Sequence, residues 1–212
     1  FVTLKYAMTL DGKIAAHTGD SRWVTGETAR RHVHETRSRL PAIMVGVGTV
    51  LADDPQLTCR IDGGRDPIRV ICDSRARTPI DSQLVQTADK IPTYIAVVGR
   101  NERTAQLEQH GVHILECPSK NGRVDLASLM QQLGALGISG VLLEGGSALA
   151  FSALEAGLVH RVQAYIAPKI IGGASAKSPV GGLGFDKMVQ ALPLKDVTCT
   201  PMGEDFLLEG RL

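Results

Sequence analysis

The sequence lacks the features that mark several classes of protein. Its longest apolar run, Ala42–Ala52, contains two glycines and a threonine and is far shorter than the roughly 20 residues needed to cross a bilayer. The 23 basic and 22 acidic residues leave a net charge of +1, so no overall field favours nucleic acid or an anionic membrane. Phe1 opens directly into a strand-like run without a preceding basic segment, which argues against a secretion signal. We therefore expect a cytoplasmic protein, and the missing initial Met suggests a piece of a longer polypeptide.

Metal-binding patterns are also missing. The sequence has six histidines but no HExxH, no HxE and no His/Cys cluster, so we do not expect this chain to hold a catalytic zinc. None of the four cysteines forms a CxxC pair. We interpret them as small buried side chains in a reducing compartment. They are Cys59, Cys72, Cys117 and Cys199.

Strand-like and helix-like segments alternate along most of the chain. Apolar, β-branched runs predict strands at 2–9, 42–47, 68–73, 93–98, 112–116, 140–143 and 162–167, with two short strands near Val197 and Phe206. Helical periodicity and caps predict helices at 26–38, 101–110, 126–136 and 147–156. Alternation followed by strands alone predicts an α/β fold with a mainly parallel sheet and an antiparallel C-terminal edge. No linker or repeat is visible, so we interpret residues 1–212 as one domain.

Two strands run into glycine turns followed by helical starts, in AIMVGVGTVLADDP and GVLLEGGSALAFSALEAG. Helix N-termini and glycines suit phosphate binding, and ligands of open α/β sheets lie beyond the carboxyl ends of strands. Neither segment has the GxGxxG or GK[ST] pattern. Each alone is explained by chain reversal. Two such turns, with Asp53 and Glu144 expected at the strand ends, favour a nucleotide cofactor site modestly.

Four other polar or aromatic residues are candidates for binding. Lys5 lies in an otherwise apolar strand, where it is either buried with a partner or an edge residue facing water. Trp23, the only tryptophan, lies in the long polar loop 10–24 and either covers a flat ring or anchors the loop. Arg37 and Arg60 suit a phosphate, but from the residues alone the better explanation is that they are solvated surface arginines.

Five segments together resemble one known family. They are LKYAMTLDGKIA at 4–15, GDSRWVTGETAR at 19–30, VGVGTVLADDPQLTCR at 45–60, LLEGGSALAFSALEAGLV at 142–159 and YIAPKIIGG at 165–173. The chain is similar over its whole length to the reductase domain of the bifunctional riboflavin-biosynthesis deaminase/reductase. The resemblance implies a dihydrofolate-reductase-like fold with a mostly parallel sheet of about eight strands, in which loop 10–24 corresponds to a mobile active-site loop. The HxE and PCxxC motifs of the family's zinc deaminase are absent, so this chain looks like the second half or a single-function homologue.

The resemblance implies an NADPH-dependent reductase that converts the ribosyl side chain of 5-amino-6-(5-phosphoribosylamino)uracil to a ribityl chain. It also implies a homodimer that is fused to, or works with, a deaminase. Matching positions imply cofactor contacts at Ala7, Trp23, Thr25, Thr49, Asp53, Ser74, Gly146, Ser147, Ala148, Leu149, Ala150, Phe151 and Ser152. They imply substrate contacts at Ser21, Arg37, Leu57, Arg60 and Glu144. They imply catalytic roles for Lys5, Asp53 and Glu144.

Reduction of a sugar imine moves protons as well as a hydride, so a carboxylate and an ammonium near the ribose are chemically sensible. The turn Ser74–Arg77 follows a predicted strand and suits the 2′-phosphate of NADPH. Three alternatives remain. One is a reductase that acts on the undeaminated diaminopyrimidinone, and another is a dihydrofolate or pteridine reductase, which the phosphate-suited arginines disfavour. The third is a non-catalytic nucleotide-binding or interaction domain.

Overall fold

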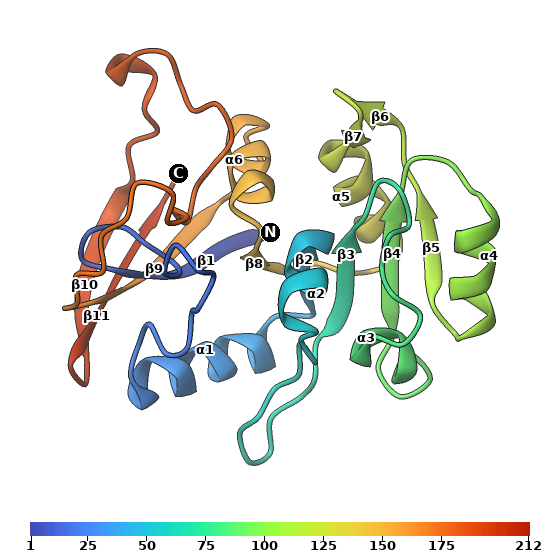
Figure 1. The fold of residues 1–212 in the computed structure, drawn as a ribbon, viewed down its shortest axis with the longest axis horizontal. Helices are drawn as coiled ribbons and strands as arrows, with labels where there is room; N and C mark the ends of the chain where they lie inside the picture. Colours follow the sequence, from blue (N-terminus) through green and yellow to red (C-terminus); the bar gives the residue numbers. More distant parts are fainter. The chain divides into compact units, whose positions relative to one another are not determined.

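The computed structural model describes residues 1–212 (Figure 1). The chain divides into two compact units. Unit 1 consists of Phe1–His34 and Ser147–Leu212, so it is built from both ends of the chain, whereas unit 2 is the continuous segment Glu35–Gly146. No helix is long and apolar enough to cross a membrane. The assignment of residues 1–212 to a single domain stays a prediction.

Unit 2 contains five parallel strands in the order β8-β2-β3-β4-β5. Four of these strands, β2, β3, β4 and β8, are mostly buried, as expected of parallel strands that helices cover on both faces, whereas the edge strand β5 has a single buried residue. A small antiparallel hairpin, β6–β7, stands outside this sheet. The strands are β2 (Ala42–Gly46), β3 (Ile68–Cys72), β4 (Thr93–Val97), β5 (His113–Glu116), β6 (Ser119–Lys120), β7 (Arg123–Val124) and β8 (Val141–Gly145).

The helices of unit 2 follow local sequence signals where they are long. In α5 (Leu126–Ala135) every third or fourth residue is a buried leucine, and the Asp125 side chain accepts a hydrogen bond from the Ala127 N–H at the helix start. Helix α4 (Glu102–Gln109) begins with a capping box and packs along β5 (Figure 1). The remaining helices, α2 (Val47–Asp53) and α3 (Gln83–Gln86), are short.

Unit 1 orders its strands β10-β11-β9-β1. Strand β1 (Val2–Thr9) is parallel to β9 (Arg161–Ala167), whereas β11 (Asp205–Arg211) is antiparallel to both β9 and β10 (Lys195–Met202). Ala29 and Val33 of α1 (Glu27–Arg39) pack with the buried side chains of Tyr165 and Leu207. Helix α6 (Ser147–Glu155) precedes β9, and a long loop with the short helix η1 (Met188–Gln190) joins β9 to β10 (Figure 1).

The predicted α/β class is confirmed, with a large, mostly parallel sheet, flanking helices and antiparallel strands at the C-terminal end. Most element positions also agree within a few residues. One local expectation was wrong: Gly48 and Thr49 do not form a turn, because α2 begins directly after Gly46 and contains both. The sequence patterns did not indicate α3, β6, β7 or η1, which span two to four residues each.

Candidate active site

The most tightly bonded group among the predicted site residues is an ion pair between Arg37 and Glu144. Arg37 Nε donates to Glu144 Oε1 and Arg37 Nη2 donates to Glu144 Oε2, both at 2.8 Å. The side chains are only 13% and 6% exposed. This bidentate geometry inside the protein is the strong form of the arginine–carboxylate pair. It joins the C-terminal end of α1 to the carboxyl end of β8, which lie 107 positions apart in the chain.

The ion pair has a further connection to the loop that follows α2. Arg37 Nη1 donates to the Thr58 carbonyl at 2.9 Å, a contact that no sequence signal indicates. Burial opposes the positive charge of Arg37, but the negative charge of Glu144 and the hydrogen bonds to it outweigh burial. The pKa of the Arg37 guanidinium is therefore raised above its ordinary value. The guanidinium thus uses three of its five N–H donors inside the protein.

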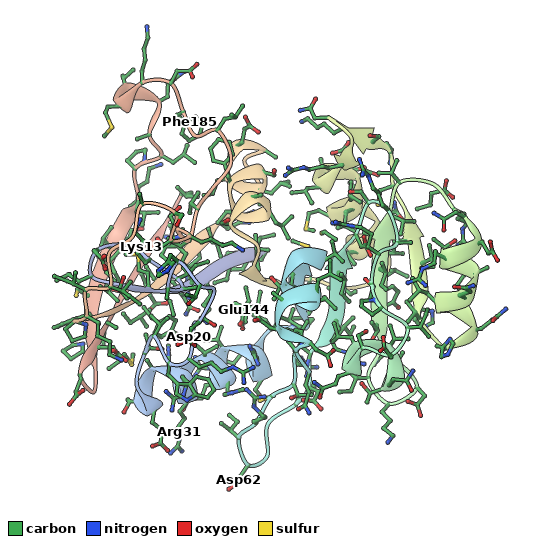
Figure 2. All side chains as sticks on the ribbon, viewed as in Figure 1. Lys13, Asp20, Arg31, Asp62, Glu144 and Phe185 are labelled. Carbon is green, nitrogen blue, oxygen red and sulfur yellow. The ribbon has the colours of Figure 1, made fainter.

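Two other predicted elements meet next to Glu144. A Cβ atom on Gly145 would lie 2.7 Å from the Thr49 hydroxyl oxygen, so glycine is what allows Thr49 of α2 to approach the end of β8. Gly146 has φ +92°, in the region that favours glycine. Figure 2 shows Glu144 beside α2. Within unit 2 the structure therefore brings together Arg37, Glu144, Thr49 and the glycine pair at the carboxyl ends of neighbouring strands β2 and β8.

Helix α6 begins directly after this glycine pair, as predicted. Not all of its predicted cofactor residues are accessible, because the side chains of Ala150 and Phe151 are 4% and 8% exposed. The Phe151 ring makes an edge contact with Phe185 of the long loop, with ring centroids 5.5 Å apart. The first N–H groups of any helix lack partners inside it. A cofactor at this helix would therefore contact its first turn, with the buried side chains serving to pack the loop.

The predicted residues of unit 1 include a second polar group around Trp23. The Trp23 indole is 62% exposed, and the guanidinium carbon of Arg30 lies 4.6 Å from its ring centroid. The Arg30 Nη1 atom donates to the Thr25 carbonyl, and Lys169 Nζ donates to the Trp23 and Val24 carbonyls. The backbone around Trp23 is thus held in place while its ring remains accessible. Ser21, a predicted substrate contact, is partly exposed two positions earlier.

Lys5 and Ala7 lie on β1 opposite Gln163 and Tyr165 of β9. The Lys5 ammonium lies 5.8 Å from the centroid of the Tyr165 ring, and the Tyr165 hydroxyl is 2.8 Å from His32 Nδ1. Lys5 is partly buried, and its strand pairs with β9 on one side.

The residues predicted around Asp53 occupy varied environments. Asp53 is exposed and is the last residue of α2, so it does not lie at the strand end where the sequence placed it. Its neighbour Asp54 has φ +37° and accepts a hydrogen bond from the Gln83 N–H at 2.9 Å. Leu57 is 5% exposed in the core, whereas Arg60 is exposed on loop 54–67. Leu57 can therefore offer a ligand little more than its backbone.

Comparison with known proteins assigns the chain to one family. The family model described as "RibD C-terminal domain" matches residues 1–208. The chain belongs to this family. It is 51% identical over 210 residues to riboflavin biosynthesis protein RibD of Actinobacillus pleuropneumoniae, covering 99% of the chain and 56% of that protein. It is 44% identical over 214 residues to 2,5-diamino-6-ribosylamino-4(3H)-pyrimidinone 5′-phosphate reductase of Methanothermobacter thermautotrophicus, covering 99% of the chain and 96% of that protein.

Solved structures of the RibD family have the same fold. Acinetobacter baumannii RibD superposes with a TM-score of 0.85 at 30% identity, covering all of this chain and 58% of that one. The deaminase/reductase of Thermotoga maritima gives a TM-score of 0.81 at 31% identity over 56% of its chain. The chain thus spans a little over half of these bifunctional relatives. Dihydrofolate reductase of Enterococcus faecalis, at 10% identity and a TM-score of 0.52, shows the shared fold alone.

Proposed function

We propose that the chain catalyses the NADPH-dependent reduction of the ribosyl side chain of 5-amino-6-(5-phosphoribosylamino)uracil to the ribityl chain in riboflavin biosynthesis. The observation that carries this proposal is the buried Arg37–Glu144 pair at the carboxyl end of β8, in a chain that belongs to a family of riboflavin-biosynthesis reductases. A carboxylate at this edge of a sheet suits the hydroxyls and ring N–H groups of a sugar–pyrimidine substrate.

The residues present fit a phosphorylated nicotinamide cofactor. Gly146, with φ +92°, has no side chain that would keep a diphosphate away from the backbone. Helix α6 starts immediately afterwards and offers N–H donors to an anion. The exposed arginines of the turn after β3 offer further positive charge. When bound, the cofactor would supply the hydride, and the residues of this chain would orient and protonate the substrate.

We assign the proton-handling and sugar-binding roles to Lys5, Asp53 and Glu144. The reacting carbon is C1 of the ribose in its open-chain imine form, so a proton must reach the ring oxygen on opening and the imine nitrogen on reduction. Lys5 carries protons suited to such transfers, and Glu144, fixed by Arg37, is suited to accept hydrogen bonds from hydroxyls. The substrate phosphate is assigned to Arg60, with the two remaining N–H donors of Arg37 as a supplement.

A second candidate substrate is the undeaminated diaminopyrimidinone, which is named in the reductase of Methanothermobacter thermautotrophicus that is 44% identical to this chain. Sequence identity does not decide between the two substrates, because RibD relatives are 33% to 51% identical to the chain. The deciding experiment is an NADPH-oxidation assay with both phosphoribosylamino-pyrimidines side by side and product analysis. Dihydrofolate serves as a third substrate. Turnover of dihydrofolate alone would establish a pteridine reductase, and no NADPH oxidation with any of the three would refute the proposal.

The same proposal includes a cytoplasmic homodimer working with a deaminase domain. Support for the deaminase comes from the bifunctional relatives. Strand β10, which is exposed at every residue except Met202, offers a sheet edge for a symmetric partner. Light scattering at micromolar concentration tests the dimer, and a monomer mass would contradict it.

A further inference from the structure

Loop 10–24 is bonded at both of its ends to a single residue, Lys169. At the start of the loop, the Leu10 N–H donates to the Lys169 carbonyl at 2.8 Å. At its end, the Lys169 ammonium donates to the carbonyls of Trp23 and Val24, at 3.2 and 3.1 Å. Lys169 lies two residues after the end of β9. The loop therefore starts and finishes on one point of the same unit.

A carboxylate adds a further connection between these two parts of the chain. We call residues 168–177, the first part of the long loop after β9, the anchor segment. Asp11 Oδ2 accepts from the Gly172 N–H at 2.7 Å, and Asp11 Oδ1 accepts from the Ile171 N–H at 3.3 Å. The Thr9 hydroxyl also donates to Oδ1, at 2.6 Å. The hydrogen bonds from Thr9 and Gly172 lower the pKa of the Asp11 carboxyl below its ordinary value, so its ionised form makes these contacts.

Loop 10–24 has little else to hold it, because none of its residues is buried. Packing in the core therefore does not fix its position, and hydrogen bonds must do so. Charge-assisted hydrogen bonds are about twice as strong as neutral ones. Asp11 supplies this kind of bond near the start of the loop, and Lys169 supplies it at the end. These two side chains are thus the strongest polar anchors between the loop and the anchor segment.

The position of the loop matters because of two residues near its end. Trp23 and Ser21 are expected to contact the cofactor and the substrate. Lys169 bonds the backbone of Trp23 itself, while the indole is 62% exposed and remains accessible. A side chain that is already ordered binds a ligand more tightly, because the entropy of ordering it no longer opposes binding. Holding the loop in place would therefore strengthen binding without adding a contact to the ligand.

We propose that Asp11 and Lys169 are positioning residues that hold loop 10–24 on the anchor segment, so that Trp23 is ordered before NADPH binds. The inference rests on the proposed function for the identity of the cofactor. Removing either side chain should leave the fold intact, free the loop and weaken the binding of NADPH. The effect on affinity arises through the loop, since neither residue is among those expected to contact the cofactor or the substrate.

The position of the loop is measured first, without turnover. Trp23 is the only tryptophan of the chain, so the anisotropy of tryptophan fluorescence reports on the loop alone. The anisotropy should fall in Asp11→Ala and in Lys169→Met. Trypsin cleavage after Lys13, which is partly buried in the loop, should become about 5- to 20-fold faster in both variants. Cleavage after Lys187, exposed farther along the chain, should keep its parental rate.

The consequence for the cofactor is measured by NADPH titration and by steady-state kinetics. Asp11→Ala and Lys169→Met should each raise the Kd and the KM for NADPH about 5- to 20-fold, with a smaller effect on kcat. Asp11→Asn keeps one acceptor oxygen and should lie between the parent and Asp11→Ala. Lys169→Met leaves the backbone bond to Leu10 intact, so it provides the answer if thermal melts show that Asp11→Ala does not fold.

The chain offers a matched control for each variant. Asp20 is an exposed aspartate of the same loop, but its carboxylate accepts from an N–H only two residues away. Lys177 is an exposed lysine of the anchor segment. Asp20→Ala and Lys177→Met should therefore keep the parental anisotropy, the parental cleavage rate and the parental Kd for NADPH.

Two results would overturn the inference. Parental anisotropy and cleavage rates in both Asp11→Ala and Lys169→Met would show that these bonds do not hold the loop. A freed loop with an unchanged Kd for NADPH would reduce both residues to structural ones. Failure of the proposed function gives a different pattern. A parent that binds NADPH but reduces neither pyrimidine would lose the function and retain the inference, whereas an active parent whose variants keep its Kd would lose only the inference.

Discussion

Unit 2 contains arginines in two opposite environments. One is Arg37, which binds Glu144 at the end of β8, and the others are Arg75 and Arg77 in the turn after β3. Arg37 is buried and has a carboxylate bound along one edge of its guanidinium. Arg75 and Arg77 are exposed, and the nearest charged oxygen to either is Asp73 Oδ1, 4.0 Å from Arg77. Burial commits three of the five N–H donors of Arg37 to the protein itself, whereas exposure leaves the guanidinium groups of Arg75 and Arg77 available to an external anion. The residue type is the same, and the surroundings decide the role.

The strongest way to break this contrast is to remove Arg37. Arg37→Met keeps the aliphatic stem but leaves Glu144 buried without its partner. We expect a loss of about 3 to 5 kcal/mol in the free energy of unfolding, measured by urea titration, with loss of turnover. The double variant Arg37→Met/Glu144→Leu should regain most of the stability and remain inactive. If Arg37→Met is as stable as the parent, the ion pair does not hold this part of unit 2 together.

The neighbours Asp53 and Asp54 offer a second comparison. Both are exposed, but the Asp54 carboxylate accepts a hydrogen bond from the Gln83 N–H. Asp53→Asn should lower kcat and kcat/KM together by about 10²- to 10⁴-fold, as for a charge used in the transition state, with little change in thermal stability. Asp54→Ala should instead cost about 1 kcal/mol in stability, because Asp54 bonds the Gln83 N–H.

The neutral control for these variants is Asp62→Asn, because Asp62 is exposed at the tip of loop 54–67 (Figure 2). Steady-state kinetics and thermal melts of all three proteins test the pair. A fully active Asp53→Asn protein would leave Lys5 and Glu144 as the catalytic candidates.

Arg60 sharpens the comparison between arginines, since it is exposed on the same loop whose Thr58 carbonyl binds Arg37. Arg60→Ala should raise KM for the phosphorylated substrate about 10- to 100-fold with a small effect on kcat and on NADPH affinity. The dephosphorylated substrate provides the control, because Arg60→Ala should not raise its KM. If the ratio of the KM values for the two substrates is the same in the variant and the parent, Arg60 does not bind the phosphate.

A further modest effect comes from shape rather than charge. Gly145→Ala places a methyl group 2.7 Å from the Thr49 hydroxyl, which should cost about 1 to 2 kcal/mol in the free energy of unfolding. Adding Thr49→Ala should relieve the clash and recover much of this loss. A Gly145→Ala protein with parental stability would mean that Thr49 simply turns away, and the close approach would then have no structural importance.

Local signals in the sequence were sufficient for elements with a cap and a clear period. The Asp125 cap and the leucines of α5, and the alternation in Val2–Thr9, predicted those elements correctly. Helix α2 was harder to recognise because it has only seven residues and contains Gly48. Such a short helix has almost no intrinsic stability, so packing of Val47 and Val50 into the core sets its extent.

The candidate site was only partly predictable for a related reason. Arg37 and Glu144 were each identified as substrate residues, but their pairing spans 107 positions and exists only once the chain has folded. Asp73 was assigned to a strand and passed over, although its carboxylate binds a threonine just five positions later. The sequence alone did not show which atoms are buried, because burial is set by the packing of the core rather than by adjacent residues in the chain.

The construction of unit 1 from both ends of the chain has a consequence for synthesis on the ribosome. Strand β1 leaves the ribosome well before its parallel partner β9, which begins only at Arg161. At typical rates of elongation, β1 waits about 8 to 30 s for that partner, whereas all of unit 2 emerges in between. Nascent chains therefore carry β1 without β9 while the intervening segment is already able to fold. During this interval β1 is a target for chaperones that bind extended apolar segments.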